Sequence, residues 1–95
     1  MNIVCFTCIT GGYDSLKQPL ARCPGVDFVC FSDNMFLSGG YWQVRPIPDE
    51  VKMFDKGKQQ RIIKICPHRW LSNYDVSVWV DGSIQVCKDI STFIS

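Results

Sequence analysis

The stretch 76–86, V-S-V-W-V-D-G-S-I-Q-V, restricts the fold more than any other part of the chain. It begins with apolar residues on both faces, because the three valines share one side of an extended strand and Trp79 lies on the other. Such a run is typical of a strand buried inside an α/β sheet. The run stops at Asp81, and a carboxylate there is costly unless it is paired, hydrogen-bonded or bound to a metal. Open α/β sheets bind ligands at such strand ends, so Asp81 is the first candidate site residue.

The remaining segments alternate between strands and helices. Pro46 and Pro48 restrict the third strand to a sheet edge or to a strand terminus, and residues 49–57 are polar and predict either an irregular segment or a turn of helix. This alternation predicts an α/β fold, with a small, mostly parallel Rossmann-like sheet of about four strands and flanking helices. The expected elements before stretch 76–86 are a central strand at Met1–Thr10, strands at Asp27–Ser32 and Tyr41–Arg45, and a helix at Lys58–Cys66.

Composition fits one small globular domain. The chain has 95 residues, of which 46% are hydrophobic and 13% aromatic, so it is neither disordered nor obviously modular. A net charge of +1 gives no argument for nucleic acid as a partner. No apolar run is long enough to span a membrane, and no signal peptide precedes the first strand, so we expect a cytoplasmic protein.

The six cysteines are expected to be free thiols. Cys5, Cys8 and Cys30 lie inside apolar strand-like runs, where thiols are commonly buried. Cys5-x-x-Cys8 has the spacing of a metal or redox pair, but residues three apart on a strand point to opposite faces. The spacing therefore argues against a zinc site.

Several polar or glycine residues follow the predicted strands. Gly11 and Gly12 permit close approach of backbone or ligand after the first strand, although they form no phosphate-binding loop of known spacing. Asp33 follows the second strand, where it either accepts hydrogen bonds from a base or ribose or forms an Asx turn. Arg61 and Lys64 lie on a basic stripe of the predicted helix, which either contacts an anionic small molecule or faces water.

Four pieces of the sequence occur together: T-C-I-T-G-G-Y-D, F-V-C-F-S-D, R-I-I-K-I-C-P-H and V-S-V-W-V-D-G-S-I. In this order they resemble the glycosyltransferase-like domain found in bacterial proteins and in plant proteins linked to cell-wall polysaccharide. Members of that family are similar to the GT-A nucleotide-sugar transferases. The resemblance covers residues 2–86 and implies a GT-A-type sheet that binds a nucleotide-sugar.

The resemblance also implies roles for individual residues. The first strand and its following loop border the nucleotide in GT-A folds, and the acid after the second strand contacts the base. Basic residues of the helix before the fourth strand face the sugar or the diphosphate. Asp81 and Ser83 stand where the family's D-x-D motif holds a divalent cation, Mn²⁺ or Mg²⁺, which stabilises the departing diphosphate. The implied nucleotide-binding residues are Thr10, Gly11, Gly12, Tyr13, Asp33, Arg61 and Lys64.

The chain departs from the family pattern in two ways. A serine, Ser83, replaces the second aspartate of the motif, which weakens the case for tight metal binding. The segments that carry the acceptor site and catalytic base in GT-A enzymes have no counterpart in these 95 residues. We therefore expect the nucleotide-sugar-binding N-terminal half of a glycosyltransferase, inactive by itself and self-associating over its exposed sheet edge. The alternatives are a nucleotide-binding module without catalysis and a structural remnant or interaction domain.

Overall fold

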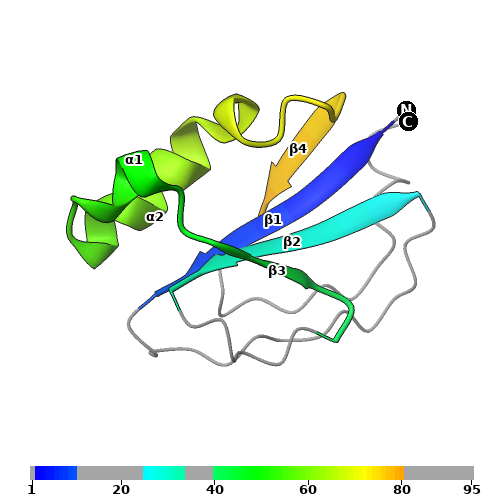
Figure 1. Cartoon of the computed structure of the whole chain (residues 1–95). Coiled ribbons are helices and arrows are strands. Elements are labelled where there is room, and N and C mark those ends of the chain that lie inside the picture. Colours follow the sequence, from blue (N-terminus) through cyan, green and yellow to red (C-terminus); the bar gives the residue numbers. More distant parts are fainter. Residues whose placement is uncertain (1, 11–24, 34–39, 81–95) are drawn as a thin grey trace.

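A computed structural model describes residues 2–10, 25–33 and 40–80. Four strands form one parallel sheet in the order β3-β2-β1-β4, so the predicted parallel α/β architecture is confirmed. In Figure 1 all four strands run in the same general direction, with their carboxyl ends toward the left of the view. The strands are β1 (Ile3–Ile9), β2 (Val26–Ser32), β3 (Gln43–Pro46) and β4 (Val76–Trp79).

The two central strands form because their residues are apolar on both faces. All seven residues of β1 are buried, and β2 is buried except at Asp27. The two strands pair over their whole length, from Ile3 opposite Val26 to Ile9 opposite Ser32. This continuous pairing places the carboxyl ends of β1 and β2 side by side at one edge of the sheet.

The sheet has a buried side chain layer on each face. One layer packs beneath the helices and includes Phe6, Val29 and Ile63. The other layer includes Cys5, Phe28 and Trp42, whose two aromatic rings meet edge to face. Cys5 and Cys8 belong to opposite layers, as the strand period requires, and the described cysteines are free. The prediction that Cys5 and Cys8 point to opposite faces of the sheet is therefore confirmed.

The helices lie on one face of the sheet, above β1 and β2 in Figure 1. They are α1 (Asp49–Lys52), α2 (Lys56–Ile65) and a 3-10 turn, η1 (Pro67–Arg69). The predicted start of α2 at Lys58 is two residues late, because the Asp55 side chain accepts a hydrogen bond from the Lys58 backbone and caps the helix earlier. Pro67 follows the end of α2 and opens η1.

One outer strand, β4, is less buried than the sequence predicts, whereas the other, β3, lies where it was expected. The stretch 76–86 predicts a strand buried inside the sheet, but β4 pairs with β1 on one side and its four residues are half-buried. Within the described residues β4 is therefore an outer strand, and Trp79 packs edge to face on Phe6. The predicted edge position of the third strand is confirmed, since β3 lies at the other end of the sheet.

A glycine allows the turn into β2. Gly25 has a φ of 78° immediately before β2, a left-handed backbone conformation that favours glycine at the turn into this strand. No helix among the described residues is long and apolar enough to cross a membrane.

Candidate functional site

The carboxyl edge of the sheet is the candidate site. In chain order the strands are added outward from β1 to β2 and then β3 on one side of the sheet. The chain then returns to add β4 on the other side of β1, so the order of strands reverses between β1 and β4. In open parallel sheets the crevice beside such a change of direction binds ligands at the carboxyl ends of the strands. Thr10 follows β1 and Asp33 follows β2, so the fold brings these two predicted site residues to the same edge.

Thr10 is held at the end of β1. Its side chain is buried, and its hydroxyl oxygen accepts a hydrogen bond of 3.3 Å from Nε2 of Gln60 on α2. The hydroxyl thus connects the central strand to the helix that covers it. This hydrogen bond fixes the carboxyl end of β1 against α2.

Asp33 is held by a lysine of the same helix. Nζ of Lys56 lies 2.6 Å from Oδ2 of Asp33, and the two side chains are 51% and 30% exposed. Lys56 is the first residue of α2, so this ion pair ties the start of the helix to the end of β2. The carboxylate is oriented and partly neutralised while it stays accessible to solvent.

A cleft of about 330 Å³ lies beside this ion pair and is partly open to solvent. It is formed where the carboxyl ends of β2 and β3 meet α1 and α2. Pro46 and Ile47 supply an apolar wall, while the lysines supply positive charge at its rim. The lining residues are Ser32, Asp33, Pro46, Ile47, Lys52, Lys56 and Gln59.

Gln59 is the most buried polar residue of this lining after Ser32. Its Nε2 donates hydrogen bonds to the carbonyl oxygens of Lys52 (3.3 Å), the last residue of α1, and of Phe54 (2.8 Å), just beyond it. Only the nitrogen of an amide can donate to two carbonyls, which fixes the orientation of the group. Its Oε1 is buried and has no hydrogen-bond partner among the described residues.

Two predicted site residues of α2 lie elsewhere. Arg61 and Lys64 are both exposed, and neither belongs to the described lining of the cleft. Nζ of Lys64 lies 5.9 Å from the centre of the Trp79 ring on β4, in cation–π contact. Lys64 therefore lies beside β4, at the end of the sheet opposite to β3.

Cys8 shows how buried the region beneath the ion pair is. Burial, together with the charges of Cys30 and Asp33, raises the pKa of its thiol from 9.0 to about 12, against a lowering effect of Lys56. Burial likewise raises the pKa of the Cys30 thiol to about 11. Both thiols are therefore protonated and weakly nucleophilic at neutral pH, so neither is suited to covalent chemistry.

The other predicted site residues lie outside the described residues. These are Gly11, Gly12 and Tyr13 of the predicted nucleotide pocket, and Asp81 and Ser83 of the predicted metal site. Among residues 2–10, 25–33 and 40–80 there is no cluster of three His, Cys, Asp or Glu side chains that would hold a metal ion. The metal site therefore remains a prediction from the motif alone.

Of the seven described lining residues of the cleft, sequence reasoning predicted only Asp33, and the missed residues include Lys52, Lys56 and Gln59. The spacing of Lys56 and Gln59, three residues apart, places both on one face of a helix, and that signal was available once the helix start was known. The position of Lys52 beside the cleft depends on the packing of α1 against α2, and no local sequence pattern predicts that packing.

Comparison with known proteins adds no family assignment. No protein-family model, curated protein or solved structure matches the chain.

Proposed function

We propose that the carboxyl edge of this sheet binds a nucleotide diphosphate, and that the chain is the nucleotide-sugar-binding portion of a glycosyltransferase. The observation that carries the proposal is the arrangement of the strand ends. The parallel order β3-β2-β1-β4 brings Thr10 and Asp33 together, and both are held by side chains from one helix, α2. This is the edge at which open α/β sheets bind nucleotides.

The chemistry of the edge fits such a ligand. A carboxylate at the end of β2 accepts hydrogen bonds from the hydroxyls or amino groups of a nucleoside, and Asp33 is accessible for this role. Asp81 comes directly after Val80 in the sequence, and we expect it to meet the diphosphate. A divalent cation held by Asp81 and Ser83 would stabilise the negative charge of the diphosphate.

Titration calorimetry tests the proposal. UDP, GDP and their sugars are added to the chain with and without Mn²⁺, and hydrolysis of the nucleotide-sugar is followed in parallel. We expect binding of at least one nucleotide diphosphate that is strengthened by the cation, and negligible hydrolysis by these 95 residues alone. Absence of heat with every ligand would remove the site assignment.

The same titrations separate the two alternatives. Binding without any turnover, also after addition of candidate acceptors, favours a nucleotide-binding module. No binding together with a folded chain favours a structural or interaction domain.

Self-association and a cytoplasmic location are also part of the proposal. The outer strand β4 has half-buried residues, and a second copy that pairs with it would bury its edge. Light scattering is expected to give at least a dimer at tens of micromolar, roughly the range of a weak specific contact, and a monomer would contradict it. The free thiols of Cys5, Cys8, Cys30 and Cys66 suit a reducing compartment.

A further inference from the structure

The cleft between β2, β3 and the two helices has features that the proposed nucleotide site does not use. The proposed nucleotide site extends from Asp33 at the end of β2 toward β4, whereas the cleft lies at the ends of β2 and β3, so Asp33 is common to both. Lys52 and Gln59 line the cleft and have no role in the proposed nucleotide site. The cleft therefore has ligand chemistry of its own beside the shared acid.

The charge of the cleft favours an anion. Its described lining carries two ammonium groups, Lys52 and Lys56, and one carboxylate, Asp33. The carboxylate is already matched by Lys56 at 2.6 Å, so the charge of Lys52 is in excess within the lining. This excess positive charge is what a phosphate group would meet on entering the cleft.

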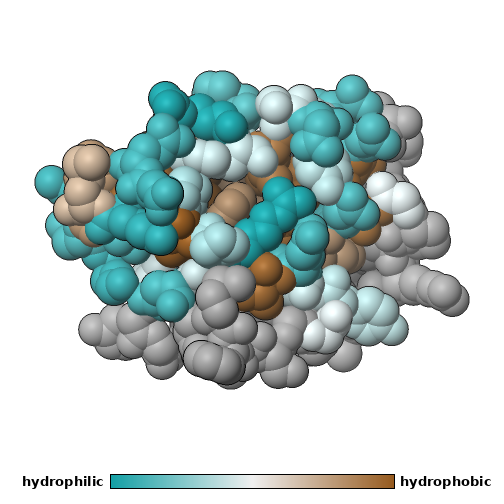
Figure 2. Space-filling model, in the orientation of Figure 1, coloured by the Kyte–Doolittle hydropathy of each residue, from teal (hydrophilic) through white to brown (hydrophobic). Residues whose placement is uncertain are grey.

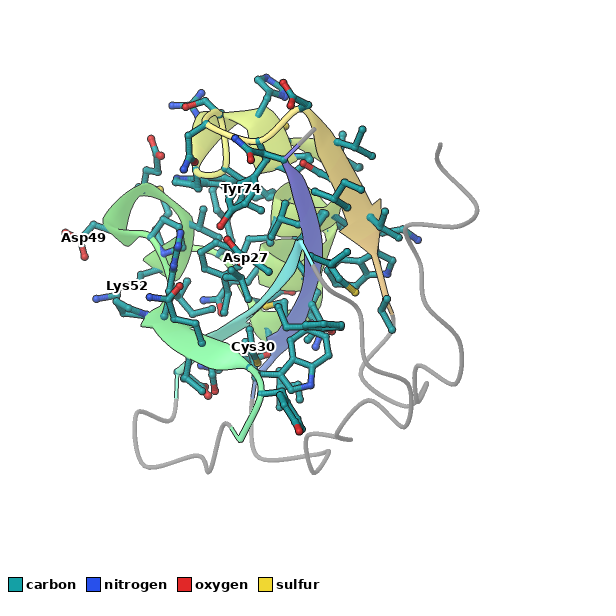
Figure 3. The ribbon with its side chains drawn as sticks, turned by 90° about the vertical axis from the view of Figure 1, so that its right-hand side faces the viewer. Asp27, Cys30, Asp49, Lys52 and Tyr74 are labelled. Atoms are coloured by element: carbon teal, nitrogen blue, oxygen red, sulfur yellow. The ribbon has the colours of Figure 1, made fainter. Side chains whose placement is uncertain are left out.

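Lys52 can turn toward such a group at little cost. Its ion-pair partner is Asp49, one turn earlier on α1, at 3.0 Å, and the two side chains are 57% and 97% exposed. Figure 3 shows both side chains extending from α1 at the outside of the molecule. Exposed pairs of this kind contribute little to stability, so exchange of the Asp49 carboxylate for a phosphate oxygen is easy.

Gln59 favours a ligand that also carries a hydrogen-bond donor. It is 4% exposed, it belongs to the lining, and its Oε1 accepts no hydrogen bond from the described residues. A buried acceptor without a partner is stabilised by a ligand that carries a donor, such as a hydroxyl group, and Oε1 meets such a donor when the side chain shifts toward the cleft, since the atom is shielded from solvent where it stands. The carboxylate of Asp33 is a second acceptor on the same lining.

The size and the lining of the cleft restrict the class of ligand that fits it. A volume of about 330 Å³ lies at the small end of ligand sites, which suits a single ring rather than a whole dinucleotide. Pro46 and Ile47 offer an apolar wall against which the C–H face of such a ring can pack. We infer that this cleft binds a phosphorylated sugar, with the phosphate at Lys52 and Lys56 and hydroxyl groups at Gln59 and Asp33.

The experiment uses the full chain and defined probes. Glucose 6-phosphate, ribose 5-phosphate, inorganic phosphate and the two unphosphorylated sugars are titrated while amide NMR shifts are followed. We expect the sugar phosphates to bind at least about tenfold more tightly than the free sugars, since a charge-assisted hydrogen bond contributes about that factor. Equal binding of phosphorylated and free sugars, or no binding of any probe, would overturn the inference.

Variants test the position of the ligand. Lys52→Gln is expected to weaken sugar phosphate binding roughly tenfold, whereas Lys58→Gln, an exposed lysine of α2 outside the lining, changes it less than about twofold. Gln59→Met is expected to weaken the sugar phosphates but not inorganic phosphate, which has no sugar hydroxyl to donate. Equal effects of the two lysine variants would contradict binding in the cleft, even if Gln59→Met proved too unstable to measure.

Asp33 is common to the cleft and the proposed nucleotide site, but variants of Lys52 and Asp81 distinguish the two. Asp81→Asn is expected to weaken nucleotide diphosphates and to leave sugar phosphates unaffected. Sugar phosphate binding that responds to Asp81→Asn and not to Lys52→Gln would contradict a separate cleft site. A chain that binds sugar phosphates through Lys52 but no nucleotide diphosphate would support the cleft and remove the proposed function.

Discussion

Nζ of Lys56 lies 2.6 Å from Oδ2 of Asp33, and this contact joins the first turn of α2 to the carboxyl end of β2. The two residues are 23 positions apart in the sequence and come from a helix and a strand that flank the cleft. The pair therefore positions the acid that is proposed to contact a nucleoside, and it also closes one side of the cleft.

A double-mutant cycle measures this contact. Asp33→Asn, Lys56→Gln and the double variant are unfolded with urea, and we expect a coupling free energy of roughly 0.5–1 kcal/mol, because both side chains are partly exposed and screened by water. The coupling is expected to shrink in 1 M salt, which screens such pairs. A coupling near zero would show that the contact does not orient Asp33 in solution.

Ile63 anchors α2 on the sheet. Its side chain is fully buried in the layer that contains Val4 and Phe6. Ile63→Ala is expected to lower the free energy of unfolding by about 2–5 kcal/mol, the usual cost of such a cavity. The matched control is Ile65→Ala in the same helix, because Ile65 is 72% exposed and its truncation should change stability by less than about 0.5 kcal/mol. Similar losses for the two variants, measured by urea unfolding, would contradict the orientation of α2.

Gln59 is expected to stabilise the connection between α1 and α2. Gln59→Leu removes the donor for the carbonyl oxygens of Lys52 and Phe54, which should cost about 1–3 kcal/mol of unfolding free energy. Lys58→Gln is the control, since this side chain is exposed on the same helix. An unchanged urea midpoint for Gln59→Leu would show that these two hydrogen bonds add no net stability. Met53 and Phe54, which follow α1, are exposed. Figure 2 shows a small pale brown, moderately hydrophobic area at the left end of the molecule, bordered by hydrophilic surface.

The raised thiol pKa values predict how stability depends on pH. The folded pKa of Cys8, about 12, lies above its ordinary value of 9.0, so folding disfavours the thiolate. The associated stability is fully present below about pH 9 and is lost as the pH rises toward 12. Unfolding midpoints measured between pH 7 and 10.5 should therefore stay level and then fall, and Cys8→Ala should reduce the fall. A fall of the same size in Cys8→Ala would assign it to other groups.

Thiol labelling tests the same burial directly. Cys5, Cys8 and Cys30 are buried, whereas Cys66 is half-buried at the end of α2. A short pulse of N-ethylmaleimide at pH 7.5, followed by peptide mass mapping, should label Cys66 well before the other three. Full labelling after addition of urea serves as the control. Rapid labelling of Cys8 in the folded chain would contradict the packing beneath α2.

The strands that build the site were predictable because their signal is local. Apolar residues on both faces of Ile3–Ile9 and Val26–Ser32 require burial on two sides, and a sheet covered on both faces provides it. The start of α2 was missed by two residues because Asp55, a capping residue, was assigned to an irregular segment. The half-burial of β4 was missed because an apolar pattern does not state the order of strands in a sheet.

The site residues also differ in whether the sequence alone could predict them. Asp33 was predictable as a strand-end acid, since its place in the sequence defines its place in the sheet. The sequence could not predict its partner Lys56 or the buried Gln59, because their contacts depend on how α2 crosses the sheet and on the short helix α1. Lys64 was predicted to face the ligand from its place on the helix before the fourth strand, and this role stays a prediction; its Nζ lies 5.9 Å from the centre of the Trp79 ring.

The affinity of nucleotide diphosphates for Asp33→Asn, compared with Asp75→Asn, tests the proposed site most directly. Both changes remove one exposed carboxylate, but Asp33 lies at the carboxyl end of β2, whereas Asp75 accepts a hydrogen bond from the backbone of Asn2 at the opposite edge of the sheet. Calorimetry with UDP and GDP in the presence of Mn²⁺ is predicted to show binding to the unaltered chain, a loss of roughly tenfold in Asp33→Asn and no change in Asp75→Asn. Equal affinities for the two variants, or no binding to the unaltered chain, would contradict a nucleotide site at this edge.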